Sequence, residues 1–286
     1  MVRRILRRIV YAVPGTQALW IRINKAAGRS PRVQFSGWGM ETETAPPWCD
    51  GGGDDLTREF LKINSEVADR VATGDMRLSQ FDEVQDKGRQ LREFMWRHYV
   101  VFWSARYAAK AAASPVTTLV ECGVCDGLTS YFAMSAAKGH GRFMAYLYDA
   151  WEGMKGECLL DSEKAAAGQY SYLSLENAKR NLRPFENEAV FVKGFIPESF
   201  RAGTTPSDIA WLHIDLNSAM PTRAALETLF DRMSTGGVIL FDDYGWSGWR
   251  ETKVAIDAFF AGKRGTLLPM PTGQALFFKH ESRGCP

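Results

Sequence analysis

Two acidic motifs in the second half of the chain each follow a run of apolar residues. Residues 211–217 read Trp-Leu-His-Ile-Asp-Leu-Asn, and residues 238–244 read Val-Ile-Leu-Phe-Asp-Asp-Tyr. If the two runs are neighbouring strands, Asp215, Asp242 and Asp243 meet at one edge and repel one another unless a cation lies among them. Carboxylates form the octahedral shell of Mg²⁺ together with water and substrate oxygens, so the motifs indicate a magnesium site. Capping of the following helices, or pairing with arginines, is the alternative.

A turn that contains two glycines follows an earlier apolar run. Residues 121–129 read Glu-Cys-Gly-Val-Cys-Asp-Gly-Leu-Thr. Glycines let the backbone approach a ligand, and the helix start that follows offers free N–H groups to a carboxylate or phosphate. The pattern differs from the G-x-G-x-x-G dinucleotide fingerprint, and a tight turn without a ligand is the alternative. Cys122 and Cys125 have C-x-x-C spacing, but no second Cys or His pair accompanies them, which disfavours a zinc site or a thioredoxin-like pair.

The next apolar run ends at Asp149, about 20 residues beyond the glycines. An acid in this place accepts hydrogen bonds from both hydroxyls of a ribose. Trp151 follows it, and this side chain either stacks on a purine or belongs to the core. The turn and Asp149 together indicate a ligand that carries a ribose.

After Ser114-Pro115, short apolar runs typical of strands alternate with amphipathic segments typical of helices. We predict strands at residues 117–122, 143–149, 189–193, 209–215, 238–242, 266–268 and 275–279, and helices at 130–138, 221–233 and 251–260. Such alternation predicts an α/β fold with a Rossmann-like, doubly wound, mostly parallel seven-stranded sheet. Ligands of these sheets bind outside the carboxyl ends of the strands, where the acids stand. Helices predicted at 55–73 and 87–113 precede the sheet and give it an N-terminal helical and loop extension.

The N-terminal segment differs in charge from the rest of the chain. Residues 1–40 contain no acid and have a net charge of +8. The rest of the chain has a net charge of −6, which gives +2 for the whole chain. Residues 1–13 have the apolar stripe of an amphipathic helix, which either packs on the protein or a second subunit, or lies on an anionic membrane surface. Residues 29–54 form a loop rich in Gly, Pro and Trp that is typical of a lid. The predicted lid residues are Trp38, Glu41, Glu43 and Trp48. We therefore predict an N-terminal part at 1–86 and a catalytic domain at 87–286.

Length and composition exclude several classes of protein. With 286 residues, 45% hydrophobic and 24% charged, the chain is neither collagen-like, nor fully disordered, nor a coiled coil. A net charge of +2 is too balanced for a surface that tracks nucleic acid. Five sparse cysteines favour a reducing compartment, and no run approaches roughly 20 apolar residues. We expect residues 1–14 to make a poor signal peptide, because Arg7 and Arg8 interrupt their apolar runs. We expect a cytoplasmic protein, with contact at the inner membrane face through residues 1–13 as an open alternative.

Taken in order, these motifs make the chain resemble the class I S-adenosylmethionine-dependent methyltransferases, and among them the magnesium-dependent sugar O-methyltransferases of the macrocin O-methyltransferase type. The resemblance covers about residues 90–280. It is carried by residues 120–127, 148–153, 193–195, 214–215 with 225–227, and 236–244. It implies that S-adenosylmethionine is bound by Glu121, Gly123, Val124, Gly127, Thr129, Asp149, Trp151, Gly194 and Asp215. It also implies that Asp215, Asp242 and Asp243 hold magnesium, as the corresponding acids do in catechol O-methyltransferase, and that the protein is a homodimer.

One residue departs from the family pattern. The family's D-G-D motif places a proposed general base two residues after the first metal ligand, and this chain has Asn217 there. An amide does not take a proton at neutral pH. Either the metal alone acidifies the substrate hydroxyl and water takes the proton, or another group does, and His213, Glu152, Glu41 and Glu43 are the candidates. A histidine beside a strand end is otherwise structural. The predicted catalytic residues are Asp215, Asn217 and His213.

The predicted function is magnesium-assisted transfer of a methyl group from S-adenosylmethionine to a hydroxyl of a sugar, on a glycan or a glycosylated metabolite. The predicted partner is a small-molecule or glycan acceptor and not a nucleic acid. One alternative is an NAD-type oxidoreductase, because the strand-turn-helix unit and Asp149 look alike in both. The other is a non-catalytic module that binds the cofactor or a membrane surface, with Asn217 marking lost activity.

Overall fold

The structure is a computed structural model of the chain, and it describes residues 34–36, 39–41, 55–82, 87–202 and 205–281. The chain divides into two compact units, Met1–Gln34 and Phe35–Pro286, and nearly all described residues belong to the second. The predicted helix at 1–13 and the predicted lid residues Trp38, Glu43 and Trp48 lie outside the described residues. Part of the predicted loop is a pair of short strands, β1 (Gln34–Ser36) and β2 (Gly39–Glu41), so that Glu41 ends a strand.

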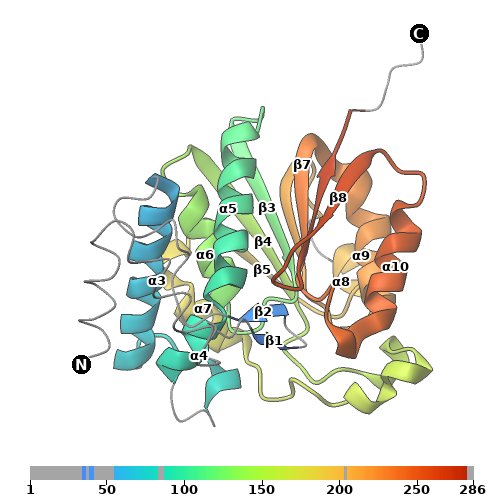
Figure 1. The fold of residues 1–286 in the computed structure, drawn as a ribbon, viewed down its shortest axis with the longest axis horizontal. Coiled ribbons are helices and arrows are strands. Elements are labelled where there is room, and N and C mark those ends of the chain that lie inside the picture. The colour runs from blue at the N-terminus through green and yellow to red at the C-terminus, as the bar shows by residue number, and fades with distance from the viewer. Residues whose placement is uncertain (1–33, 37–38, 42–54, 83–86, 203–204, 282–286) are drawn as a thin grey trace, which may run out of the picture. The chain divides into compact units, whose positions relative to one another are not determined.

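A seven-stranded mixed sheet forms the centre of the second unit and confirms the predicted fold class (Figure 1). Its order is β5-β4-β3-β6-β7-β9-β8, and β9 runs antiparallel between β7 and β8 while the other pairs are parallel. The strands are β3 (Val116–Cys122), β4 (Arg142–Asp149), β5 (Ala189–Lys193), β6 (Ile209–Ile214), β7 (Met233–Phe241), β8 (Gly265–Pro269) and β9 (Ala275–Lys279). Strand order reverses between β3 and β6, the place where such sheets bind ligands.

Helices cover both faces of the sheet, because successive strand residues point to opposite sides. Leu119 and Trp211 pack with one core cluster, and their neighbours Val120 and Leu212 pack with another. Figure 1 shows α3, α5 and α6 on one side of the sheet, and α9 and α10 on the other. Within the described residues, no helix is long and apolar enough to cross a membrane. The helices are α3 (Asp55–Thr73), α4 (Lys87–Glu93), α5 (Met95–Ala111), α6 (Leu128–Ala137), α7 (Leu175–Asn181), α8 (Glu198–Ala202), α9 (Ala219–Leu229) and α10 (Arg250–Phe260).

The single helix predicted at 87–113 is wrong, because the structure has two helices, α4 and α5, that meet at Phe94. Phe94 is a turn residue between the two helices, with φ −87° and ψ −1°. Most of the second helix is buried: three successive residues, Val100, Val101 and Phe102, are inside, and the face that carries Trp103 and Tyr107 is half-buried. A helix buried over most of its circumference belongs to a protein interior. The helix α5 is therefore a core element that reaches the carboxyl edge of the sheet.

The strand register brings the predicted motifs to one edge. Cys122 pairs with Ile214, and Ile214 pairs with Phe241, so the next residues, Gly123, Asp215 and Asp242, emerge side by side. Backbone bonds extend the ladder one step further: Asp215 N–H donates to the Cys122 carbonyl at 2.9 Å, and Asp242 N–H donates to the Ile214 carbonyl at 3.1 Å. Each of the two strands ends one residue earlier than predicted, so Asp215 and Asp242 are the first residues after β6 and β7.

Close packing at this edge requires a glycine at position 123. Its φ is +92°, and a Cβ there would lie 1.8 Å from the Asp215 carbonyl oxygen. The backbone of the β3 turn therefore touches the backbone that ends β6. A side chain of any size would separate these two strand ends.

We predict that Gly123→Ala lowers the free energy of unfolding by at least about 2 kcal/mol, because it adds a steric clash to a strained backbone angle. Gly139→Ala is the matched control, since Gly139 has φ +91° and nothing within 4 Å of its Cβ position. Urea unfolding of both variants separates the clash from the strain. Equal losses in the two variants would contradict this account of the turn.

Candidate active site

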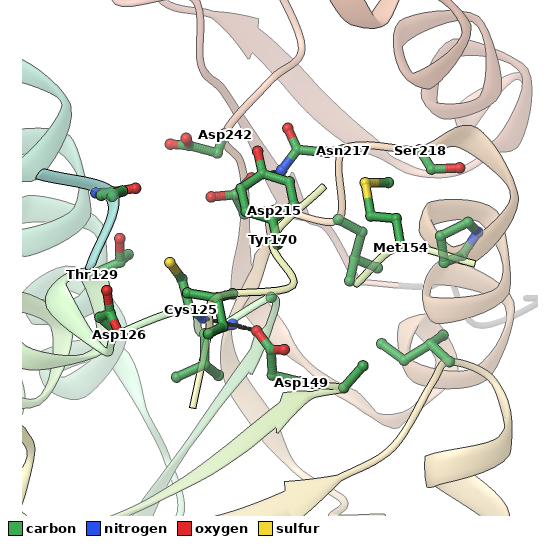
Figure 2. A pocket seen from close by; sticks show the side chains of 18 of the residues that line it. Cys125, Asp126, Thr129, Asp149, Met154, Tyr170, Asp215, Asn217, Ser218 and Asp242 are labelled. Carbon is green, nitrogen blue, oxygen red and sulfur yellow. Dashed lines mark hydrogen bonds between the residues drawn. The ribbon is translucent and has the colours of Figure 1, made fainter. Parts of the chain in front are cut away.

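A cavity opens at the carboxyl edge of the sheet, and we call it the edge cavity (Figure 2). The glycine turn, the residues after β4, β5, β6 and β7, the helix α5, and the loop between β4 and α7 all contribute to its lining. The lining includes Gln80, Phe94, Arg97, His98, Gly123, Val124, Cys125, Asp126, Thr129, Asp149, Glu152, Met154, Tyr170, Gly194, Phe195, Asp215, Asn217, Asp242 and Gln274. Of the predicted cofactor residues, Gly123, Val124, Thr129, Asp149, Gly194 and Asp215 lie in this wall.

Asp149 braces the glycine turn. Its Oδ2 accepts the N–H groups of Val124 and Cys125, each at 2.8 Å, and its Oδ1 accepts the N–H of Trp151 at 2.7 Å. Burial raises the pKa of Asp149, and the three backbone donors oppose that shift. The turn needs this support because Cys125, with φ +55°, is a non-glycine residue in the left-handed region. The carboxylate at the end of β4 thus shapes the turn from the cavity side.

Three predicted cofactor residues stand behind the lining. Trp151 is 4% exposed and packs in the core near Phe191, while its indole N–H donates to the Cys125 carbonyl at 2.9 Å. Gly127, with φ +83°, precedes the first turn of α6. Glu121 is buried beneath the turn. Purine stacking by Trp151 does not fit this placement, because the indole is fixed in the core.

Phe195 takes the place in the wall that was predicted for Trp151. It follows Gly194 directly, lines the edge cavity, and carries Lys155 Nζ 4.0 Å above its ring centroid. The sequence did contain a signal for it, the aromatic residue in the motif at 193–195. Side-chain direction, which no local pattern supplies, decides between the two aromatic residues.

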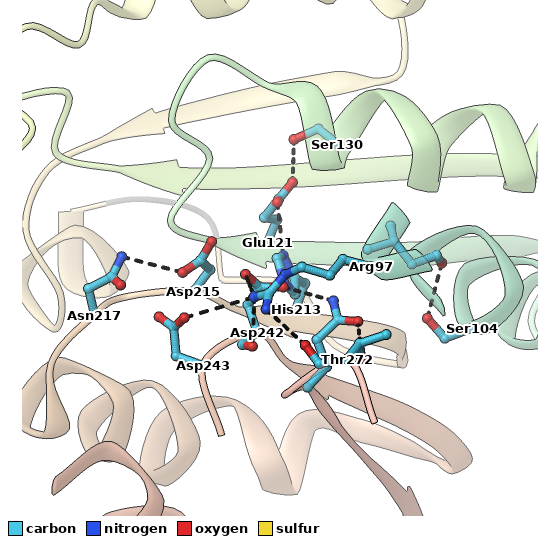
Figure 3. A network of polar contacts seen from close by, with 12 residues as sticks. Arg97, Ser104, Glu121, Ser130, His213, Asp215, Asn217, Asp242, Asp243 and Thr272 are labelled. Carbon is cyan, nitrogen blue, oxygen red and sulfur yellow. Dashed lines mark hydrogen bonds and ion pairs between the residues drawn. The ribbon is translucent and has the colours of Figure 1, made fainter. Parts of the chain in front are cut away.

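The structure brings Asp215, Asp242 and Asp243 together, with one carboxylate oxygen from each within 4.8 Å of the others. A cation from a distant part of the chain joins them (Figure 3). Arg97 of α5 is 5% exposed; it hydrogen-bonds the Asp242 carboxylate and donates to the Asp242 carbonyl at 2.9 Å and the Thr272 carbonyl at 3.0 Å. Arg97 Nη2 also lies 3.9 Å from Asp243 Oδ1, so the predicted alternative of arginine pairing holds for Asp242 and, more weakly, for Asp243.

The three carboxylates are held very differently. Asp242 is saturated, because Arg97 occupies Oδ2 and Gln274 Nε2 donates to Oδ1 at 2.8 Å. Burial alone would raise the pKa of Asp242, but Arg97 and His213 hold it well below its ordinary value. Among the described residues, neither oxygen of the buried Asp243 has a hydrogen-bond partner. Burial, together with repulsion by Asp242, raises the pKa of Asp243 to about 7.

Asp215 is the third member of the cluster and faces the cavity. Burial, with repulsion by Asp242 and Asp243, raises its pKa well above the ordinary value. Asn217 Nδ2 donates a long hydrogen bond of 3.4 Å to Asp215 Oδ1. Asp215 accepts one long hydrogen bond, and Asp243 has no hydrogen bond and only a 3.9 Å ion pair with Arg97. These two carboxylates therefore fit a small divalent metal ion, whereas both oxygens of Asp242 accept hydrogen bonds.

His213 lies behind the acid cluster, outside the lining of the edge cavity. It is fully buried, with Nδ1 2.9 Å from Glu121 Oε1 and Nε2 3.9 Å from Asp242 Oδ1, and Glu121 in turn accepts a hydrogen bond from Ser130. Burial lowers the pKa of His213, but Asp242 and Glu121 outweigh it and raise the pKa to about 10. Because His213 is buried and does not line the edge cavity, it supports Asp242 and Glu121 in this structure, and its role as a base stays a prediction.

The charge of the wall restricts the ligand. Five acids line the edge cavity and only two cations, Arg97 and Lys155, do so among the described residues. His98 adds no charge, because burial lowers its pKa to about 3. Such a wall attracts a cationic ligand and repels a pyrophosphate. The acids are Asp126, Asp149, Glu152, Asp215 and Asp242.

Comparisons with known proteins agree with this geometry. Residues 120–244 match a family model described as a methyltransferase domain. The chain is 26% identical over 175 residues to the 8-demethyl-8-(2,3-dimethoxy-α-L-rhamnosyl)-tetracenomycin-C 4'-O-methyltransferase of Streptomyces olivaceus. That match covers 57% of this chain and spans 65% of the relative's length.

Two solved structures share the fold. The O-methyltransferase NovP has a TM-score of 0.62 at 20% identity, over 79% of this chain and 100% of that one. CalS11, a calicheamicin methyltransferase, has a TM-score of 0.50 at 17% identity, over 80% of this chain and 98% of that one. The resemblance to class I methyltransferases of this type, expected from the sequence, is confirmed.

We predict that Arg97→Met lowers the free energy of unfolding by about 3–5 kcal/mol, because it leaves the buried Asp242 without its counter-charge. Arg223→Met is the control: Arg223 forms an exposed ion pair with Glu227, and its loss should cost less than about 1 kcal/mol. Chemical denaturation measures both. Similar small losses would show that the acid cluster does not depend on Arg97.

Proposed function

We propose that this chain, which carries a class I S-adenosylmethionine-dependent methyltransferase domain, transfers a methyl group from S-adenosylmethionine to a hydroxyl of a sugar. The observation that carries the proposal is an acid-lined cavity at the carboxyl edge of a methyltransferase sheet. The curated relative, named for methylation of a rhamnosyl group, supports the choice of acceptor. The overall change joins the acceptor oxygen to the methyl carbon, breaks the carbon–sulfur bond and releases the hydroxyl proton.

The wall of the edge cavity suits this cofactor. Bound S-adenosylmethionine supplies an activated methyl group on a cationic sulfonium, and the surplus of carboxylates favours that charge. We assign Gly123, Val124 and Thr129 to its amino-acid end, Asp149 to the ribose, and Gly194 with Phe195 to the adenine. The same charge disfavours the NAD-type alternative, because a dinucleotide brings a pyrophosphate.

We assign a magnesium site to Asp215 and Asp243, with Asp242 held by Arg97 beside them. A bound magnesium ion would orient neighbouring oxygens of the acceptor and lower the pKa of the hydroxyl that is methylated. Asn217 cannot take the proton, and His213 is buried outside the cavity lining. Glu152 lines the cavity, with its carboxylate 3.4 Å from Lys193 Nζ, and either it or water takes the proton.

The N-terminal part, residues 1–86, is assigned to acceptor enclosure and assembly. Trp38, Glu41, Glu43 and Trp48 would close over the sugar, since aromatic faces pack on sugar C–H surfaces and exclude water. Residues 1–13 would contact a second subunit of a homodimer, or an anionic membrane surface as the alternative. These assignments rest on the sequence pattern.

We predict that titration calorimetry shows about one S-adenosylmethionine per chain. With magnesium present, S-adenosylhomocysteine should then form on addition of a rhamnoside. The panel should include methyl α-L-rhamnopyranoside and rhamnosides methylated at other positions. Cofactor binding without turnover on any sugar would reject the sugar assignment. Absence of cofactor binding would reject the whole proposal.

We predict that Asp243→Asn has opposite effects on stability without and with magnesium. Without metal it should raise the free energy of unfolding by about 1–2 kcal/mol, because it removes a buried carboxylate that has no hydrogen-bond partner and lies beside Asp242. With magnesium it should lose the metal-induced rise in melting temperature. Asp231→Asn, at an exposed position, is the control and should change neither. A full magnesium-induced rise in Asp243→Asn would contradict the assigned site.

A further inference from the structure

The loop between β4 and α7 places a tyrosine inside the edge cavity. Tyr170 lines the cavity together with Met154 and Asn217, and Figure 2 shows its ring at the centre of the view next to Asp215. The side chain lies within electrostatic reach of the Asp215 and Asp243 carboxylates. Its aromatic ring therefore faces the acids at which methyl transfer is proposed to occur.

The loop imposes this position on Tyr170. Its φ of +65° lies in the left-handed region, which is unfavourable for a non-glycine residue. Two backbone bonds join the loop's ends beside it: Met154 N–H donates to the Gln169 carbonyl at 2.9 Å, and Gly168 N–H donates to the Met154 carbonyl at 2.8 Å. Leu173 N–H donates to the carbonyl of Tyr170 itself at 3.0 Å. The surrounding structure thus over-determines a strained residue, a situation that clusters at ligand sites.

The hydroxyl of Tyr170 is available to a ligand. Within the described part of the chain, no hydrogen-bond partner reaches it. Burial and the nearby carboxylates raise its pKa above the ordinary value, so the group is a neutral phenol that keeps its proton. A phenol both donates and accepts hydrogen bonds, and its ring offers an apolar face. Sugars present the matching surfaces, hydroxyl groups around a ring with exposed C–H bonds.

We propose that Tyr170 is an acceptor-binding residue, which donates a hydrogen bond to a sugar oxygen beside the methylated hydroxyl and packs its ring on the sugar. The inference rests on the proposed function and adds a residue to it. Asn217 leaves the acid edge one carboxylate short of the family pattern, and Tyr170 faces that same edge. The phenol would fix the acceptor's orientation, while proton removal stays with Glu152 or water.

The test compares Tyr170→Phe with Tyr172→Phe. Tyr172 is two residues away on the same loop but 52% exposed and outside the cavity lining, so its substitution controls for loop effects. The probe is methyl α-L-rhamnopyranoside, titrated by ligand-observed NMR onto protein saturated with S-adenosylhomocysteine and magnesium. We expect Tyr170→Phe to bind it about three- to tenfold more weakly, the loss of one hydrogen bond with the ring retained. Tyr172→Phe should bind it like the wild type.

Cofactor affinity, measured by calorimetry, separates a binding role from a structural one. It should be unchanged in both variants, because Phe keeps the packing of the ring. If the wild type binds the rhamnoside and Tyr170→Phe binds it equally well, the inference alone is overturned. If Tyr170→Phe also loses cofactor affinity, the residue is structural and the inference is overturned. If the wild type binds the cofactor but not the rhamnoside, the sugar assignment fails and the inference fails with it.

Discussion

The buried ion pair between Arg97 and Asp242 is the constraint on which the carboxyl edge of the sheet depends. Parallel strands bring carboxylates together at one edge, and buried carboxylates repel one another. Arg97 of α5 hydrogen-bonds the Asp242 carboxylate, and His213 of β6 lies 3.9 Å from it, so both reduce this repulsion. Figure 3 shows the resulting chain of contacts from Ser130 through Glu121, His213 and Asp242 to Arg97 and Thr272. These residues come from helices on one face of the sheet and from several strands. Their contacts therefore hold α5 and α6 against the sheet edge.

This polar chain divides the acid cluster into two parts with different tasks. Asp242 has every oxygen occupied and belongs to the framework. Asp215 lines the cavity, and Asp243, buried next to it, has no hydrogen bond, so these two carboxylates are proposed to hold a cation. Removing one partner of a buried pair is costly, which explains why the compensating cation is an arginine anchored by two further carbonyl bonds. A stable framework thus lies next to reactive groups.

The glycine turn after β3 is also held by contacts from neighbouring strands. Gly123 allows the β3 turn to touch the end of β6, and Asp149 holds the turn from β4 through three backbone bonds. The indole N–H of Trp151 donates to the Cys125 carbonyl from the core, and Phe195 lines the edge cavity. The wall that results is rigid, apolar in places and acidic overall. The loop that carries Tyr170 covers it from the other side, held by its own backbone bonds.

The sequence by itself determined the sheet, the glycine turn and the acids at the strand ends. Short apolar runs and their turn residues are local signals, and the rule that parallel strands end at a common edge brings Gly123, Asp149, Asp215 and Asp242 together without further information. The break at Phe94 escaped prediction because the apolar pattern continues through it. Two short helices, α7 and α8, were missed because their patterns are too brief.

Only the tertiary structure decided which partner each of these residues has. Nothing local marks Arg97, an arginine in an apolar helix, as the counter-charge of an aspartate 145 residues later. The same is true of the difference between Asp242 and Asp243, which are adjacent in sequence: both oxygens of Asp242 accept hydrogen bonds, whereas neither oxygen of Asp243 does. Tyr170 stands in a loop without periodicity, so its direction is set by the loop's contacts. Long-range pairing depends on the relative placement of elements, and a local pattern carries no information about it.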